Sequence, residues 1–322
     1  MRVFITGGSG FIGTNLIGYL QGREVDVLNF DIESPRNPKQ LECWVQGDIL
    51  NEGALIAAIQ KFDPHYIVHL AARTDLDGTS IADYSANIEG VENVVNSLKY
   101  ATSLKRVLFA SSRLVCEIGY KPKSNTDYCP TTPYGESKVA GEGIVNSRAN
   151  DIPCPWLIFR PTSIWGPWFG TPYKDFFMTI LGGRYVHPRN TRIRKSFGFV
   201  GNSVYMLGKF MRCDETLINK KTVYLTDYPE IEVKDWADRV SIAAGKRKTI
   251  EVPMFVLKLL AFVGDALKKT GVNSPPLTTF RLNNLLTEML HETTLVNEVC
   301  GELPYQLNDG IKETLEWIKN VD

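Results

Sequence analysis

Tyr134 and Lys138 are the side chains in this sequence best suited to chemistry, because they stand four positions apart in the run Tyr-Gly-Glu-Ser-Lys. On a helix, that spacing places both side chains on the same face. The phenol of tyrosine has an ordinary pKa of about 10, and a neighbouring ammonium group lowers that pKa by favouring the phenolate. We therefore expect Tyr134 to exchange a proton with a hydroxyl or carbonyl group of a substrate. A tyrosine and a lysine at this spacing also occur by chance, so the surrounding elements must decide.

A glycine-rich run, TGGSGFIG at residues 6–13, stands between a predicted strand and a predicted helix. The first of its spaced glycines permits a tight turn, and the second lets the backbone approach a pyrophosphate. The third lets helix and strand pack closely, and the start of the helix adds partial positive charge. These three glycines are Gly7, Gly10 and Gly13. The run predicts a dinucleotide site, and a bound nicotinamide cation would lower the pKa of Tyr134 further.

Asp31 decides which dinucleotide we expect. It ends the second predicted strand, 18 residues after Gly13. A carboxylate at this place can accept hydrogen bonds from the ribose hydroxyls and repels a 2′-phosphate, which predicts NAD. Arg36 keeps NADP open as an alternative, because an arginine nearby could accommodate that phosphate.

Strand and helix patterns alternate through the first half of the chain. Predicted strands lie at 3–5, 25–31, 44–45, 66–70, 106–110 and 154–159, and predicted helices at 11–20, 55–59, 81–101 and 134–150. Later we expect a strand at 222–226 and helices near 233–244, 254–269 and 308–320. Such alternation is typical of an α/β fold, here a Rossmann-type doubly wound parallel sheet with a smaller, interleaved C-terminal substrate lobe. We expect an NAD-binding domain at 1–161 and a substrate-binding lobe at 162–322, part of which returns to the sheet.

Composition narrows the class of protein. The chain has 322 residues, with 36 Lys plus Arg against 36 Asp plus Glu, so nothing in its net charge attracts nucleic acid. Its six cysteines form no C-x-x-C pair and its four histidines lack metal-ligand spacing, so we expect no metal and no disulfide framework. The apolar stretch 254–263 contains Lys258 and is shorter than the roughly 20 residues of a membrane span. We therefore expect a cytoplasmic protein without a membrane span.

The motifs occur in an order that resembles the extended short-chain dehydrogenase/reductase superfamily, and within it the NAD-dependent epimerase/dehydratase family that acts on nucleotide sugars. Besides residues 6–13 and the Tyr134–Lys138 pair, the matching runs are Gly47-Asp48-Ile49, His69-Leu70-Ala71-Ala72, Asn87-x-x-Gly90, Ser111-Ser112 and Arg160-Pro161. The resemblance covers residues 2–200 well and the C-terminal third loosely.

The resemblance implies a role for each matching residue. Ser112, Tyr134 and Lys138 would be catalytic, with Ser112 bonded to the reacting oxygen and Lys138 to the nicotinamide ribose. The implied NAD-binding residues are Gly7, Gly10, Phe11, Ile12, Gly13, Asp31, Asp48, Ile49, Leu70, Ala71, Ala72, Arg73, Asn87, Ser111, Tyr134, Lys138 and Pro161. The implied substrate residues are Ser112, Tyr134, Thr162, Ser163, Arg194 and Lys195. A homodimer through helices 81–101 and 134–150 is also implied.

Departures from the family pattern refine the expected reaction. The 4,6-dehydratases carry Thr-Asp-Glu where this chain has Ser112-Arg113-Leu114, so the acid pair for eliminating water is missing. Lys195 stands where many members have arginine, and Ser163 where many have asparagine. We therefore expect a nucleotide-sugar epimerase acting at C4 through a transient keto sugar. A net dehydrogenase or reductase acting on a sugar or hydroxysteroid-like alcohol remains the alternative, and a non-enzymatic NAD-binding protein is a third interpretation.

Overall fold

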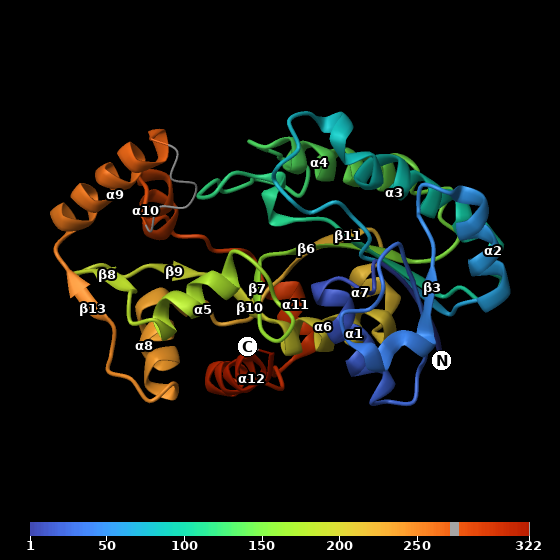
Figure 1. Cartoon of the computed structure of the whole chain (residues 1–322). Helices are drawn as coiled ribbons and strands as arrows, with labels where there is room; N and C mark the ends of the chain where they lie inside the picture. The colour runs from blue at the N-terminus through green and yellow to red at the C-terminus, as the bar shows by residue number, and fades with distance from the viewer. Residues whose placement is uncertain (271–276, 322) are drawn as a thin grey trace.

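A seven-stranded parallel sheet forms the centre of the protein in a computed structural model that describes residues 1–270 and 277–321 (Figure 1). Its strand order is β11-β6-β5-β4-β1-β2-β3. The strands are β1 (Arg2–Thr6), β2 (Asp26–Asp31), β3 (Trp44–Gln46), β4 (Tyr66–His69), β5 (Arg106–Ala110), β6 (Trp156–Pro161) and β11 (Lys221–Leu225). Every neighbouring pair is parallel, which confirms the expected doubly wound α/β fold.

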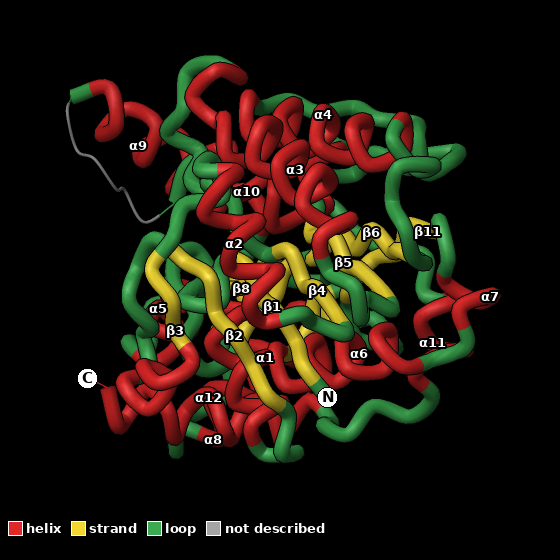
Figure 2. Tube along the Cα trace, turned by 90° about the vertical axis from the view of Figure 1, so that its right-hand side faces the viewer, coloured by secondary structure: helices red, strands yellow, loops and turns green. Residues whose placement is uncertain are grey.

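Helices cover both faces of this sheet (Figure 2). One face carries α2 (Glu52–Phe62), α3 (Ser85–Ser97) and α4 (Pro133–Ser147). The other carries α1 (Phe11–Gln21) and α6 (Val200–Arg212), with α11 (Thr294–Cys300) and α12 (Leu307–Val321) beyond them. The strands read as short, nearly continuous apolar runs because both faces are buried. This arrangement leaves the loops at the carboxyl ends of the strands to form a site.

The second half of the chain builds the remaining lobe from short elements. These are β7 (Ser163–Trp165), α5 (Tyr173–Leu181), β8 (Val186–Pro188), β9 (Arg194–Lys195), β10 (Phe197–Phe199), β12 (Ile231–Glu232), α8 (Val233–Ala243), β13 (Ile250–Val252), α9 (Met254–Lys269) and α10 (Thr279–Leu286). Three two-stranded sheets, β10-β7, β12-β9 and β13-β8, connect these pieces. The short helix α7 (Glu215–Ile218) follows α6 and lies beside the central sheet instead (Figure 1). Strand β11 comes from this half of the sequence and forms one edge of the central sheet.

Two details differ from the sequence predictions. The helix expected at 81–101 is divided into a 3₁₀ turn (Ile81–Tyr84), α3 and a second 3₁₀ turn (Leu98–Tyr100), the first of which begins with a capping box between Ser80 and Asp83. Helices α6, α7, α10 and α11 were not predicted. Helix α6 matters most, because it packs against α1 beneath the sheet.

Candidate active site

The glycine-rich turn joins β1 to α1 at the carboxyl edge of the sheet. Gly7 has a φ of 72°, and a Cβ atom there would lie 2.4 Å from the backbone nitrogen of Ala71. Only glycine fits this position, because both the backbone conformation and the approach of the loop after β4 exclude a side chain. The turn therefore brings Leu70 and Ala71, two predicted cofactor residues, directly against Gly7.

The first turn of α1 suits an anionic pyrophosphate. Its N-cap residue is Gly10, which has no side chain that could cap the helix, and the first turn of α1 contains no acidic residue. The leading backbone N–H groups thus remain available to a ligand, and the helix dipole favours a negative charge there. Phe11 and Ile12 begin this helix and are half-buried, while Gly13 is buried. These features fit NAD at the predicted place.

Asp31 lies beside the same turn, at the end of β2. One carboxylate oxygen accepts the backbone N–H of Ser9 at 2.9 Å and the other accepts that of Glu33 at 3.0 Å. Burial is the largest influence on this carboxyl and raises its pKa, while the two backbone bonds oppose that effect. Arg36 donates to the carbonyl oxygen of Trp168 at 3.0 Å, so its guanidinium is directed to the second half of the chain.

Asn87 holds the middle of the predicted cofactor crevice together. Its side-chain oxygen accepts the backbone N–H of Arg73 at 2.9 Å, and its amide donates to the carbonyl of Arg73 at 3.0 Å and to Ser137 Oγ at 2.9 Å. Asn87 therefore connects the loop after β4 with α3 and α4. Three residues further along α3, the buried side chain of Ile49 packs at Gly90, and Asp48 accepts the N–H of Leu50 at 2.9 Å.

Tyr134 reaches Ser112 because the start of α4 packs directly on the segment after β5. Thr132 caps α4 by accepting the N–H of Gly135 at 3.0 Å. A Cβ atom on Gly135 would lie only 2.3 Å from the carbonyl oxygen of Leu114, so a side chain at this position would push the two segments apart. Ser112 in turn accepts the N–H of Leu114 at 3.1 Å, and its hydroxyl is near enough to Tyr134 to lower the pKa of the phenol.

The protonation of Tyr134 differs from the sequence expectation. Burial raises its pKa, and this effect outweighs the hydrogen bond from Ser112 and the charge of Arg113, both of which lower it. The expectation that the lysine ammonium lowers this pKa was therefore wrong for the protein alone, because the ammonium is directed elsewhere and the phenol is almost fully buried. The ring of Tyr134 packs against Tyr84 with centroids 5.9 Å apart. Arg113 and Tyr84 are site residues that the sequence analysis missed.

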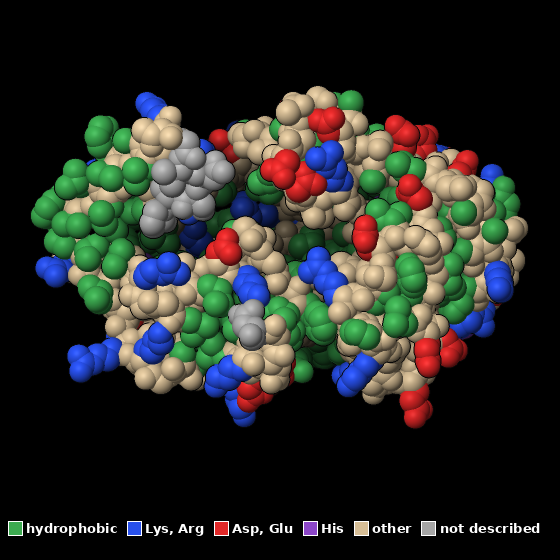
Figure 3. Space-filling model, viewed as in Figure 1, with side chains coloured by type: hydrophobic (Ala, Val, Ile, Leu, Met, Phe, Trp, Pro, Cys, Tyr) green, Lys and Arg blue, Asp and Glu red, His purple; other side chains and the backbone are tan. Residues whose placement is uncertain are grey.

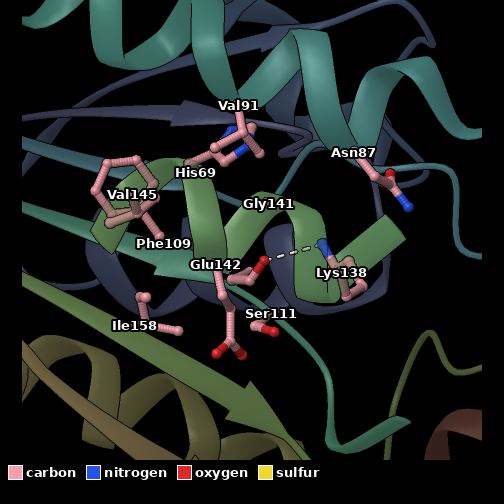
Figure 4. A pocket seen from close by; sticks show the side chains of 11 residues that line it. His69, Asn87, Val91, Phe109, Ser111, Lys138, Gly141, Glu142, Val145 and Ile158 are labelled. Atoms are coloured by element: carbon pink, nitrogen blue, oxygen red, sulfur yellow. Dashed lines mark hydrogen bonds between the residues drawn. The ribbon is translucent and has the colours of Figure 1, made fainter. Parts of the chain in front are cut away.

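Lys138 lies one turn further along α4 and is buried (Figure 4). Its Nζ atom donates to the carbonyl oxygen of Ala110 at 2.9 Å, and burial lowers its pKa to about 8 although Glu142 favours the charged form. A cavity of about 10 Å³ lies beside it, lined in part by His69, Asn87 and the predicted cofactor residue Ser111. This cavity is too small for a substrate and belongs to the interior behind the crevice.

The histidine at this cavity is a packing residue. His69 Nδ1 and Thr6 Oγ1 share a hydrogen bond of 2.7 Å. Burial lowers the pKa of His69 to about 3, so the ring is neutral. Below it, Glu142 and Arg160 form a buried ion pair of 2.7 Å that fixes α4 on β6. Pro161 then ends β6 at the edge of the site.

The predicted substrate residues divide into two groups. Lys195 is buried, donates to the carbonyl oxygen of Asn284 at 2.5 Å, and has its pKa lowered to about 8 by burial and by the charge of Arg113. Arg194 is exposed and pairs with Glu230 at 2.5 Å and Glu288 at 3.3 Å, so two carboxylates already neutralise its charge. Lys195 instead lies near enough to Arg113, the residue after Ser112, for the charge of Arg113 to affect it.

The remaining two substrate residues follow β6. Thr162 is half-buried and donates to the carbonyl oxygen of Leu225 at 3.2 Å, and Ser163 is buried in β7. On the other side of Arg113, a pocket of about 60 Å³ lies between segments 113–121 and 288–291. His291 borders it, stacks on Tyr224 and has its pKa lowered to about 3, mainly by burial.

No helix within 1–270 or 277–321 is long and apolar enough to cross a membrane. The same residues contain no group of three or more His, Cys, Asp or Glu side chains able to hold a metal ion.

Residues 3–186 match the NAD dependent epimerase/dehydratase family. The chain belongs to this family. Membership of this family makes the protein an NAD-dependent enzyme. The glycine-rich turn, Asp31 and the Tyr134–Lys138 pair agree with that.

Individual relatives agree with this assignment. The chain is 24% identical over 324 residues to the N-acetyl-alpha-D-glucosaminyl-diphospho-ditrans,octacis-undecaprenol 4-epimerase of Escherichia coli O157:H7, covering 98% of this chain and 95% of the relative. It is 28% identical over 267 residues to a 3-beta-hydroxysteroid dehydrogenase of Mycolicibacterium neoaurum, covering 76% and 71%. The structure of UDP-glucose 4-epimerase from Thermotoga maritima with UDP-glucose superposes with a TM-score of 0.74 at 18% identity, over 99% of each chain, which shows the shared fold.

Proposed function

We propose that this enzyme is an NAD-dependent epimerase that inverts C4 of a sugar carried on a diphosphate, with nucleotide sugars as its substrates. The nearness of the Ser112 and Tyr134 hydroxyls, supported by the effect of Ser112 on the pKa of Tyr134 and by the close packing of Gly135 on Leu114, carries the proposal. It places a proton donor and acceptor where the carboxyl ends of the strands bind ligands. The full-length similarity to a 4-epimerase supports the same reaction.

In the proposed reaction, the positive charges of bound NAD and of Lys138 would favour the phenolate form of Tyr134. The phenolate takes the proton of the C4 hydroxyl as the hydride leaves C4, and Ser112 donates a hydrogen bond to the reacting oxygen. NAD, when bound, supplies the hydride acceptor. The keto sugar then turns within the site, receives the hydride on its other face and takes its proton back from Tyr134. Lys138 would hold the nicotinamide ribose, and its bond to Ala110 keeps the side chain in place.

The diphosphate would lie near Arg113 and Lys195. These two cations are close enough that the charge of Arg113 lowers the pKa of Lys195. A bound anion would relieve that repulsion between like charges. Thr162 and Ser163 would face the sugar from the end of β6, whereas Arg194, already paired with two carboxylates, would stabilise the lobe.

Product analysis tests this proposal. Purified enzyme is incubated with NAD and, in separate reactions, UDP-glucose, UDP-N-acetylglucosamine and UDP-glucuronic acid, and products are followed by proton NMR. We expect the C4 epimer of at least one substrate to form without accumulation of NADH. Steady release of NADH in step with loss of a sugar substrate would instead identify a net dehydrogenase.

The second candidate function is that net dehydrogenase, acting on a hydroxysteroid-like alcohol. Its support is the 28% identity to a 3-beta-hydroxysteroid dehydrogenase. The same residues, Ser112, Tyr134 and Lys138, would move the proton and hydride. Release of NADH with a 3β-hydroxysteroid, and no product from any UDP-sugar, would establish this alternative.

Three further expectations accompany the proposal. Residues 1–161 would bind NAD and residues 162–322 the substrate. Helices α3 and α4 would form the interface of a homodimer, which light scattering of the purified protein tests directly. The enzyme would work in the cytoplasm, where fractionation of expressing cells would find it.

A further inference from the structure

The outer face of α9 is apolar and exposed. Phe255 is 71% exposed, Leu259 61% and Phe262 70%, and these residues share one side of the helix because they are spaced by four and three positions. The opposite side, Leu257, Ala261 and Gly264, is buried against α10. A helix that is apolar on two sides is not expected at a water-facing surface.

Neighbouring side chains extend this apolar face. Leu260, Val263 and Leu267 continue it along α9, and Phe280, at the start of α10, is 72% exposed. Figure 3 shows hydrophobic side chains gathered over this end of the molecule, where α9 lies in Figure 1. We call these seven residues the α9 face: Phe255, Leu259, Leu260, Phe262, Val263, Leu267 and Phe280.

The charges around the α9 face are mainly positive. Helix α9 carries Lys258, Lys268 and Lys269, and α10 carries Arg281, against the single acid Asp265. Asp265 accepts the backbone N–H of Thr279 at 3.2 Å, so its charge caps α10. An exposed apolar helix face bordered by lysines is typical of a helix that lies in the interface of a membrane containing anionic lipids.

The same helix pair borders the substrate side of the active site. Thr287 directly follows α10 and packs closely on Gly119. A Cβ atom added to Gly119 would lie only 2.8 Å from Cγ2 of Thr287. Segment 288–291 then lines the pocket next to Arg113. In Figure 3 a hollow containing Lys and Arg side chains lies between this end and the side formed by α3 and α4. Any surface that binds the α9 face would therefore lie near the entrance to the site.

We propose that the α9 face docks the enzyme on the surface of a lipid bilayer with anionic headgroups. The helix lies in the plane of the membrane, with its phenylalanines among the acyl chains and its lysines at the headgroups. It does not cross the bilayer, because α9 has 16 residues and no described helix is long and apolar enough to span one. The docking is peripheral, so it is compatible with a cytoplasmic enzyme.

Vesicle flotation of the full chain tests the proposal. Vesicles of phosphatidylcholine alone are compared with an equal mixture of phosphatidylcholine and phosphatidylglycerol. The test variant is Phe255→Ser with Phe262→Ser, and the matched control is Ile242→Ser, which changes an isoleucine of α8 that is 52% exposed. Thermal unfolding and turnover of a soluble UDP-sugar without vesicles check that each variant is folded.

We expect the wild-type protein and the control to float with the mixed vesicles, and high salt to weaken their binding because ions screen the lysines. The double variant should partition at least about tenfold more weakly, because two aromatic side chains no longer leave water. Failure of the wild type to float with mixed vesicles, or equal flotation of the double variant, would overturn the proposal. Light scattering that shows self-association lost only in the double variant, with no vesicle binding by any form, would assign the face to a second copy instead.

Discussion

Replacing Gly135 by alanine tests whether close packing of α4 on the segment after Ser112 positions Tyr134. The new Cβ atom would meet the carbonyl oxygen of Leu114 at 2.3 Å, whereas contacts of real Cβ atoms essentially never fall below 3.0 Å. The segments must therefore separate by about 0.7 Å, because a backbone oxygen cannot swing aside as a side chain does. That movement pulls the phenol of Tyr134 away from Ser112.

The expected effect on turnover is large relative to the effect on folding. A misplacement of about 1 Å can lower catalysis by about a hundredfold, so we expect turnover in Gly135→Ala to fall by about ten- to a hundredfold. Alanine is favoured over glycine inside a helix by about 1 kcal/mol, and this gain partly offsets the steric cost. The variant should therefore fold, with a melting temperature at or below that of the wild type.

Gly18→Ala is the matched control. It adds the same methyl group inside a helix, α1, where the nearest atom is Gln40 Nε2 at 3.9 Å. We expect unchanged turnover and a stability gain of about 0.5–1 kcal/mol. Circular dichroism during heating and product formation by NMR measure both variants. If Gly135→Ala shows wild-type turnover and the same stability gain as Gly18→Ala, the proposed packing does not position the tyrosine.

Three further substitutions address charge and cofactor choice. Lys138→Met should abolish most turnover yet leave the melting temperature at pH 7 equal or higher, because burial lowers the pKa of this lysine to about 8. The difference in melting temperature from wild type should shrink between pH 8 and 10.5, where the lysine of the native state is already neutral and that of the unfolded state is still charged. Asp227 is half-buried, with Oδ1 out of contact with water, and accepts the N–H of Phe199. Burial of this carboxyl raises its pKa from 3.8 to about 7, so its carboxylate destabilises the fold progressively as pH rises through that window. Asp227→Asn should therefore raise the melting temperature at pH 8 and lose this advantage near pH 4. Asp31→Ser should weaken NAD binding and improve NADP binding in calorimetric titrations, because it removes the charge that repels a 2′-phosphate; unchanged preference would place the adenosine ribose elsewhere.

Local patterns explain what the sequence predicted. The glycine-rich turn is determined by residues within one βα unit, since Gly7 is needed both for its φ and for the approach of Ala71. The tyrosine and lysine are related by helix geometry alone, and parallel strands follow from alternation with helices. Helix α6 could also have been found, because Val204, Leu207 and Met211 repeat at helical spacing and are buried.

Long-range contacts explain what the sequence did not predict. Arg194 was grouped with Lys195, but its partners Glu230 and Glu288 come from distant parts of the chain and direct it elsewhere. The raised pKa of Tyr134 depends on burial by several elements, which spacing does not reveal. The sequence did contain a signal for Arg113, since it directly follows Ser112. The prediction used this position only to note that the acid of the dehydratases is absent, and not that a positive charge stands there.

The decisive measurement is turnover by Tyr134→Phe together with its affinity for NAD. Phenylalanine keeps the packing on Tyr84 and removes only the phenolic hydroxyl, whose pKa Ser112 lowers. If the phenolic oxygen transfers the substrate proton, kcat should fall by about 10²–10⁴-fold, with NAD affinity and melting temperature close to wild type. Turnover near the wild-type rate in a folded, NAD-binding variant would contradict the proposed role of Tyr134 and, with it, the mechanism.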